Sequence, residues 1–341
     1  MFHMESRPHR LSLAAAAAVA AVAVVSAVGA SASAATVRAG AAAAQPAAST
    51  SGNLFASVSE SGTLVSGTSG AKVTVLGTGQ YEVTFPQNVS GCAYVATTVN
   101  AYSQALQAYT AGGHLSPDGV YVETKNQGGG LTAGPFNLVV DCGRPGWSYA
   151  VVGYSANLVR STPGTTLTSL GVGRYDVSFP SSVSSCAYLA TVADPGNALV
   201  YNPAGVYTGS GDNANTVYIE TKNTGGGLSS GIPFHLAVVC PGAASTNFAV
   251  ANASGLPVRT SPLTSSYQAG TGSYVMIVGS SLAGCATVAT RGSVDTSVPY
   301  TPATVEIVPG NGANSVGIQV RDLLFFGGNL DNQSFHAAAV C

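Results

Sequence analysis

The sequence is poor in charged side chains: only 8% of its 341 residues are Asp, Glu, Lys or Arg, against about a quarter in an average globular domain. It has a single Trp and three Met. Recognition of a nucleic acid needs Lys and Arg gathered into a patch, and no such cluster occurs. A basic amphipathic helix, which would suit a membrane surface, is also missing. The sequence therefore argues against nucleic acid and a membrane surface as partners.

Motifs for cofactor, metal and catalytic chemistry are missing as well. There is no C-x-x-C pair, the histidines lack zinc-ligand spacing, and no serine lies in a G-x-S-x-G turn. The G-x-G steps at Gly77, Gly171 and Gly270 precede strand-like runs, whereas a phosphate loop precedes a helix. Glu123 and Glu220 each stand two residues before a lysine, which favours an ion pair over a general acid. We expect no cofactor, no metal and no enzymatic activity.

The first 35 residues have the pattern of a secretory signal peptide. Arg7 and Arg10 give a basic start, and an Ala/Val-rich run follows from residue 11 to residue 30. An uncleaved anchor is the alternative, because this run approaches the length that spans a bilayer. The small-residue steps that come next favour removal of the segment, so we expect a secreted chain without a membrane segment. Cleavage is predicted after Ala32, Ala34 or Ala35.

Residues 36–52 are mainly Ala, Gly, Ser and Thr. Such a segment has too few large apolar side chains to build a core, which predicts a flexible linker. Removal of residues 1–35 takes away Arg7, Arg10 and Glu5, leaving 10 basic (12 − 2) and 13 acidic (14 − 1) residues. The secreted chain would therefore carry a net charge of about −3 (10 − 13), which is low for its size.

The remaining sequence contains three copies of one pattern. Each copy has a G-x-Y segment followed by a strand-like run, and then a C-A-x-x-A-T segment. A repeat of fixed period indicates one structural unit built several times, and the third copy is the most divergent. The two segments begin at Gly79 and Cys92 in the first copy, at Gly173 and Cys186 in the second, and at Gly272 and Cys285 in the third.

Aligning the copies predicts modules over residues 53–142, 147–240 and 247–341. Alternating residues define the faces of their strands: Tyr81, Val83 and Phe85 share one face, with Glu82 and Thr84 on the other. We expect about five to seven strands per module, in an antiparallel β-sandwich that is Ig-like or jelly-roll-like. The one helix candidate is residues 101–109. The short connectors fit either a rod or a pseudo-threefold cluster.

Six cysteines behind a signal peptide predict three disulfides. Each copy holds one cysteine at the start of its C-A-x-x-A-T segment and one at the end of its last, Phe-led strand. Only pairing within a copy lets every copy form the same bridge. The predicted pairs are Cys92–Cys142, Cys186–Cys240 and Cys285–Cys341.

A possible binding face lies between the two cysteines of the first two copies, in the segments V-Y-V-E-T-K-N and V-Y-I-E-T-K-N. Alternation places a Tyr, a Glu and a Lys of each segment on one face, expected to point outward. Tyrosine is favoured at interfaces, although an exposed tyrosine is also ordinary on a sheet. The third copy has Gly317 and Gln319 instead. The residues of this face are Tyr121, Glu123, Lys125, Tyr218, Glu220 and Lys222.

His235 and His336 occupy the same place in copies two and three, directly after the Phe of the last strand, where copy one has Asn137. Alternation points them away from the core of their own module. Repeated outward histidines suit a metal or a sugar, but the ordinary interpretation is an exposed strand residue. We therefore expect both histidines at the surface.

The combined string GxYxVxFP…CAYxAT…VYxETKN…PFxLxVxC resembles a β-repeat module of secreted actinobacterial proteins. The resemblance assigns no activity and transfers no functional residue. With the observations above it implies a secreted, non-enzymatic binding or structural protein at the cell exterior, with an unknown protein or glycan as ligand. A carbohydrate-binding protein is one alternative. An inhibitor of a secreted hydrolase is another, with residues 100–118 and 194–215 as candidate protruding loops.

Overall fold

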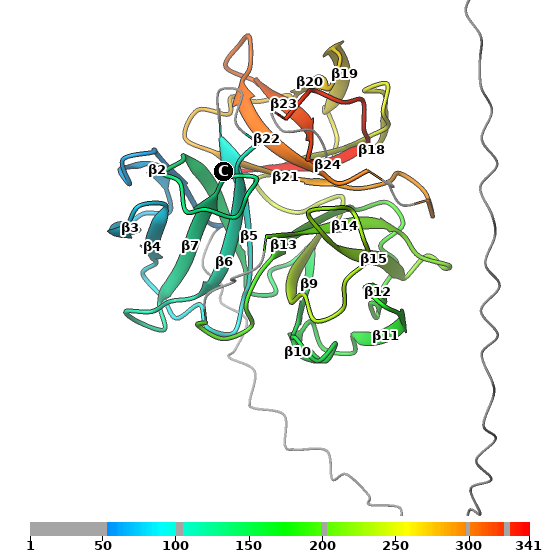
Figure 1. Ribbon diagram of the computed structural model, residues 1–341. Coiled ribbons are helices and arrows are strands. Elements are labelled where there is room, and N and C mark those ends of the chain that lie inside the picture. Colours follow the sequence, from blue (N-terminus) through cyan, green and yellow to red (C-terminus); the bar gives the residue numbers. More distant parts are fainter. Residues whose placement is uncertain (1–52, 100–104, 199–202, 298–300, 324–327) are drawn as a thin grey trace, which may run out of the picture. The chain divides into compact units, whose positions relative to one another are not determined.

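The computed structural model describes residues 53–99, 105–198, 203–297, 301–323 and 328–341. Every regular element in these ranges is a β-strand (Figure 1). The predicted signal peptide and linker, residues 1–35 and 36–52, lie outside the described residues. So does the first part of the helix candidate at 101–109, and its last residues belong to a strand.

The first module contains eight strands in two antiparallel layers, one more than the largest number expected from sequence. Strand β6 runs through the end of the helix candidate. One layer has the order β2-β1-β8-β5 and the other β3-β4-β7-β6. The strands are β1 (Leu54–Val58), β2 (Leu64–Gly67), β3 (Lys72–Gly77), β4 (Gln80–Thr84), β5 (Ala93–Val99), β6 (Gln107–Gly112), β7 (Gly119–Lys125) and β8 (Phe136–Asp141).

The second and third modules repeat this arrangement strand for strand. Module 2 has β9 (Trp147–Val152), β10 (Leu158–Ser161), β11 (Thr166–Gly171), β12 (Arg174–Ser178), β13 (Ala187–Val192), β14 (Ala204–Ser210), β15 (Thr216–Asn223) and β16 (Phe234–Val239). Module 3 has β17 (Thr246–Ala251), β18 (Pro257–Thr260), β19 (Ser265–Gly270), β20 (Ser273–Ile277), β21 (Ala286–Arg291), β22 (Ala303–Pro309), β23 (Ser315–Asp322) and β24 (Phe335–Val340). The chain is thus an all-β protein built from β-sandwiches.

The repeated motifs make the core of each sandwich. In module 1, the Tyr81 ring packs against Phe136 across the two layers, with ring centroids 5.2 Å apart. Tyr274 and Phe335 make the same contact in module 3 at 5.0 Å. Burial of aromatic side chains is the largest single contribution that a core of this size receives. The alternation predicted for Tyr81, Val83 and Phe85 is confirmed, because all three are buried in one cluster.

The glycine that opens each G-x-Y segment has a left-handed backbone and a crowded neighbourhood. Gly79 has φ of +66°, and a Cβ there would lie 2.6 Å from the carbonyl oxygen of Thr124. The carbonyl of Gly79 accepts a 2.8 Å hydrogen bond from the Thr124 N–H. Only glycine combines this φ with so close a backbone contact, which explains why each copy retains it.

The three disulfides are those predicted, each within one module. Cys92 directly precedes β5 and Cys142 directly follows β8, and these strands are neighbours in one layer. The bridge therefore joins adjacent strands instead of crossing the sandwich. It closes a loop of 50 residues in module 1, which contributes roughly 4 kcal/mol if the entropy of the unfolded chain governs its effect.

The modules pack together closely, and the described residues form one compact unit. We call the three interfaces seam 1–2, seam 2–3 and seam 3–1. At each seam, the last residue of one C-A-x-x-A-T segment bonds both backbone groups of an alanine in the neighbouring module. The pairs are Thr191 with Ala96 (N–H to Oγ1 2.9 Å, Oγ1 to O 3.2 Å), Thr290 with Ala190 (2.7 and 3.1 Å), and Thr97 with Ala289 (both 2.9 Å).

These contacts run from module 1 to 2, from 2 to 3 and from 3 back to 1, so they close a ring. Strand β5 lies beside β13 and β21 at the centre of the picture (Figure 1). Apolar residues from the outer faces of the disulfide-bearing layers fill the space between modules, among them Val139, Leu189 and Val288. Strands β5 and β22 also pair in parallel, which joins two layers into one eight-stranded sheet. The arrangement is a cluster and not a rod.

Candidate functional site

The predicted binding face is not a surface in module 1. Tyr121, Glu123 and Lys125 are only 2%, 3% and 4% exposed. In module 2, Glu220 and Lys222 are also buried and Tyr218 is half-buried. The expectation that these six side chains point into solvent is therefore wrong for five of them.

The outer edge of β6 is covered by the next module, which pairs with its backbone. The N–H of Gly112 donates to the carbonyl of Gly196 (2.6 Å), and the N–H of Asp194 donates to the carbonyl of Thr110 (2.9 Å). The same pattern recurs at seam 2–3, where Ser293 N–H reaches Thr208 O at 2.8 Å. The described parts of segments 100–118 and 194–215 thus contain seam contacts and strands.

The buried face of module 1 holds a chain of polar contacts. Gln80 Nε2 donates to the hydroxyl of Tyr121 (2.7 Å), which donates to Glu123 Oε1 (2.9 Å). Lys125 Nζ lies 2.7 Å from Glu123 Oε2 and 5.1 Å from the ring centre of Tyr109. Charges this deep are tolerated only when they are paired and hydrogen-bonded. Glu123 and Lys125 form a structural ion pair.

Module 2 repeats this unit. Tyr218 donates to Glu220 Oε1 (3.0 Å), and Lys222 Nζ lies 2.9 Å from Glu220 Oε2 and 5.2 Å from the ring centre of Tyr207. Arg174, in the place of Gln80, adds a second cation 3.3 Å from Glu220. Burial and the negative charge of Glu220 raise the pKa of Tyr218 to about 12. The tyrosine therefore acts as a hydrogen-bond donor at neutral pH.

Module 3 uses a different set of side chains to balance charge at the same positions. Arg321 replaces the lysine, Gln319 replaces the glutamate, and Glu306 stands where Tyr109 and Tyr207 stand in the other modules. The guanidinium binds the carboxylate of Glu306 and donates to Gln319 Oε1 at 2.6 Å. The acidic side chain lies on the neighbouring strand in this module, and the half-buried arginine keeps a partner. The divergence noted at Gln319 is thus compensated within the sheet.

A carbohydrate platform would need coplanar, open tyrosine rings at positions 121 and 218. The Tyr121 ring is instead covered by His114, which stacks on it with centroids 3.9 Å apart and planes inclined by 14°. Glu123 and Lys125, the two charged side chains of this face in module 1, neutralise each other. In module 1 the face therefore stabilises the sheet, and its Tyr121 ring is not open to a ligand.

His235 and His336 are completely buried, so the expected surface position is wrong for both. Each points away from its own core, as alternation predicted, but into a neighbouring module. Tyr94 N–H donates to Nδ1 of His235 (2.9 Å), and Tyr188 N–H donates to Nδ1 of His336 (2.8 Å). Neutral histidines are required, because Nδ1 must keep its lone pair. Both histidines belong to the seams.

An arginine completes each histidine seam. Arg160 lies with its guanidinium carbon 5.9 Å from the ring centre of Tyr94 and donates to Cys92 O at 3.1 Å. Arg259 lies 4.8 Å from the ring centre of Tyr188 and donates to Ser184 O at 3.3 Å. Seams 1–2 and 2–3 therefore contain the same Arg–Tyr–His unit.

Seam 3–1 lacks all three members of that unit. The equivalent positions are Ser66, Thr287 and Asn137, and Asn137 Nδ2 donates to Thr287 O at 2.7 Å. In sequence, these three departures fall in two different copies and look unrelated. In the structure they meet at one interface. That coincidence is the sequence signal that would have identified the seams.

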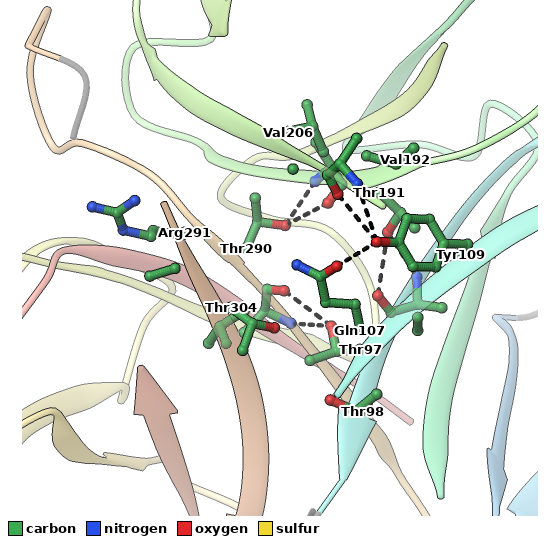
Figure 2. A pocket seen from close by; sticks show the side chains of 18 residues that line it. Thr97, Thr98, Gln107, Tyr109, Thr191, Val192, Val206, Thr290, Arg291 and Thr304 are labelled. Carbon is green, nitrogen blue, oxygen red and sulfur yellow. Dashed lines mark hydrogen bonds between the residues drawn. The ribbon is translucent and has the colours of Figure 1, made fainter. Parts of the chain in front are cut away.

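A small cavity of about 70 Å³ lies where the three modules meet. Thr97, Thr191 and Thr290 surround it, and the amide of Gln107 reaches in among them (Figure 2). The hydroxyls of the three threonines are already bonded to the alanines of the ring, and Tyr109 donates to the Gln107 carbonyl oxygen. A volume of this size holds about two water molecules.

The cavity is lined unequally by the three modules. At the position of Gln107, module 2 has Gly205 and module 3 has Thr304, as the pairing of each residue with its neighbouring strand shows. The hydroxyl of Thr304 donates to Leu106 O of module 1 at 3.1 Å. The centre therefore contains one long side chain, one short side chain and one position with none.

The exposed apolar side chains gather elsewhere, on the two free edge strands of each module and their turns, which we call the rims. The rims are β2 and β3, β10 and β11, and β18 and β19, each at the end of its layer. Val65, Val159 and Val258 occupy equivalent positions on them and are 68%, 44% and 52% exposed. Figure 1 shows the labels β3, β11 and β19 at the outside of their modules.

Within the described ranges, no group of three or more His, Cys, Asp or Glu side chains is placed to hold a metal ion. None of the same residues forms a helix with the length and apolar character that crossing a bilayer requires. No protein-family model, curated protein or solved structure matches the chain.

Proposed function

We propose that the protein is a secreted, non-enzymatic structural and binding component of the cell exterior, and that the rims are its contact surface. The observation that carries the proposal is the character of the rim strands. They end their sheets, so their outer backbone groups have no strand partner, and they bear exposed valines at equivalent positions in three modules. Exposed apolar edges of this kind are ready to pair with another strand.

Charge on the rims is low. Lys72 is the exposed charged residue of these strands, while Arg160 and Arg259 are half-buried and turn toward the seams. Soluble proteins usually protect edges with lysine or proline, and here most of that protection is missing. A contact protein with three disulfides suits the oxidising conditions outside the cell. The rims carry most of the exposed large apolar side chains among the described residues.

The test compares residues 36–341 with a variant that carries Val65→Lys, Val159→Lys and Val258→Lys, one substitution per module. Association is followed by analytical ultracentrifugation over a range of concentrations, and binding by co-sedimentation with isolated cell envelopes. We expect the wild-type protein to associate or co-sediment, and the triple variant to lose at least about tenfold in either measure, because lysine opposes edge pairing.

Leu115→Lys is the matched control, because Leu115 is 61% exposed but lies outside the rims. It should behave like the wild-type protein. Equal behaviour of the wild type and the rim variant in both assays would refute the rims as a contact surface. Turnover of envelope polymers by the purified protein would refute the non-enzymatic assignment.

A further inference from the structure

The two histidine seams both belong to module 2. In seam 1–2, module 2 supplies His235 and Arg160 against Tyr94 of module 1. In seam 2–3, module 2 supplies Tyr188 against His336 of module 3. Seam 3–1 has no histidine in its described part and is joined by the parallel pairing of β5 with β22. Any event that affects buried histidines therefore acts on both sides of the middle module and spares the other seam.

The surroundings of His235 disfavour a positive charge. Its Nδ1 faces the Tyr94 N–H, so a proton there would place two donors against each other. The charged group facing it is Arg160 from β10, and the neutral phenol ring of Tyr94 faces it from β5. Thr191 and Val151 lie beside it on its own sheet. The carboxylate of Asp194 is bonded to backbone N–H groups of its own loop, and only the Asp194 carbonyl faces the ring.

His336 is held in the same way. Its Nδ1 accepts from Tyr188 N–H, and its Nε2 lies 3.0 Å from Ser293 O. Arg259 is the cation that faces it from β18, and Thr290 and Val250 are its neighbours in the sheet. Among the described residues, no carboxylate side chain offsets the effect of the nearby arginine on either ring. Protonation would thus break the Tyr–His hydrogen bond and add a second buried positive charge in both seams.

We propose that acid releases module 2 from both neighbours while modules 1 and 3 stay joined, so that the closed ring opens around its middle module. The two short connectors keep the released module tethered, and the three disulfides lie within modules and do not oppose the movement. The Arg–Tyr–His unit that responds to acid is present at seams 1–2 and 2–3, and the equivalent positions of seam 3–1 hold other residues.

The pKa values of the two histidines determine how the stability of seams 1–2 and 2–3 changes with pH. Burial first, and then the arginine, lower the pKa of His235 well below its usual value and that of His336 to about 3. Histidines whose folded pKa is depressed contribute stability above the ordinary value near 6.5, and that contribution falls as pH decreases toward the folded pKa. Seams 1–2 and 2–3 should therefore weaken progressively below about pH 6.

The experiment follows residues 36–341 from pH 7 to pH 3 at constant ionic strength, by small-angle scattering and by hydrogen exchange corrected for the intrinsic rate. We expect an increase in radius of gyration, with loss of protection in β5 around Tyr94 and in β13 around Tyr188. Protection at Ala289, whose N–H donates to Thr97 Oγ1 at 2.9 Å across seam 3–1, should persist to lower pH.

The matched variant is His235→Asn with His336→Asn, because Asn137 is the residue that seam 3–1 already uses at this position. The pH at which this variant opens should be lower than that of the wild-type protein by at least about one unit. Each single substitution should protect only its own seam. Circular dichroism at pH 7 establishes that the variants fold.

Arg160→Gln provides a second test that does not depend on replacing a histidine. Removing the cation brings the folded pKa of His235 closer to its usual value, so the stability of seam 1–2 should change less between pH 7 and pH 3 than in the wild-type protein. The proposal is overturned if the wild type and the double asparagine variant open at the same pH. It is also overturned if seam 3–1 loses protection together with the other two seams.

Discussion

Thr191 of module 2 satisfies both backbone groups of Ala96 in module 1: the Ala96 N–H donates to its hydroxyl oxygen at 2.9 Å, and the hydroxyl donates to the Ala96 carbonyl at 3.2 Å. One side chain thus replaces the strand partner that Ala96 lacks at this point. Since the equivalent threonines do the same at the other seams, the last letter of the C-A-x-x-A-T motif is explained by contacts between modules. The role of this threonine cannot be recognised from a single copy, because its partner lies in another module.

Thr191→Val should lower the free energy of unfolding by about 2–4 kcal/mol. Valine has nearly the same shape, but it leaves the N–H and carbonyl of Ala96 buried without partners, each at a cost of about 1–3 kcal/mol. Urea titration followed by circular dichroism measures the change. Thr191→Ser keeps the hydroxyl and should cost about 1 kcal/mol. Equal losses for valine and serine would contradict the hydrogen-bonding role.

Asp141→Asn should stabilise the protein at neutral pH. Asp141 is buried, and burial raises its pKa from 3.8 to about 6, against the opposing effect of Arg144. A raised folded pKa stabilises the fold at low pH, and this contribution is lost as pH rises through about 6. The two-unit difference corresponds to at most about 3 kcal/mol.

Chemical denaturation of the wild type and the Asp141→Asn variant at pH 5 and pH 7.5 tests this expectation. The variant should gain stability relative to the wild type between the two pH values. Glu60→Gln, which alters an exposed carboxyl of the same module, should give no such gain. A difference between Asp141→Asn and wild type that does not change with pH would contradict the prediction.

Removal of the Cys92–Cys142 bridge by a double alanine substitution should lower stability by about 4 kcal/mol. Because one apolar cluster includes side chains of all three modules, the loss should shift a single unfolding transition and not release module 1 by itself. Differential scanning calorimetry distinguishes the two outcomes. The Cys285–Cys341 pair serves as the comparison and should produce the same behaviour. A separate low-temperature transition would show that the modules unfold independently.

Residues 147–240 expressed alone should form a homotrimer. Module 2 is the one module that carries both halves of the histidine seam, with Tyr188 on one side and His235 with Arg160 on the other. Three copies can therefore close the same ring. Size-exclusion chromatography with light scattering gives the mass. A stable monomer would contradict the complementarity, and so would a trimer of equal stability after His235→Asp.

The internal construction of each module could be predicted from sequence because a period of two separates the faces of a strand. Tyr81 and Val83 are in the core as expected, and the repeat itself selected the disulfide pairs. Strand β6 was harder to predict, because its two alanines and its glutamine favour a helix in isolation. Its strand conformation depends on pairing with β7, residue by residue from Gln107 to Gly112.

What lies against the outer face could not be predicted in the same way. Alternation correctly predicted that His235 and Tyr121 point away from the core of their own module. A period of two does not show whether the opposite face contacts solvent or another part of the protein. Val139 and Leu189 gave an indication, since both are apolar on faces that would otherwise meet water. The low content of charged residues in the whole chain also indicates that outer faces are buried, because a chain with less exposed surface needs fewer charged side chains.

The unequal lining of the central cavity has a consequence for how such a molecule can arise. Three separate polypeptides with identical sequences would bring three glutamines to one spot, or three glycines, and the space would be overfilled or hollow. Joining the units end to end frees each position to be chosen by itself, so Gln107 can fill the gap that Gly205 leaves. Covalent linkage here permits a more closely filled interior than three identical copies would have.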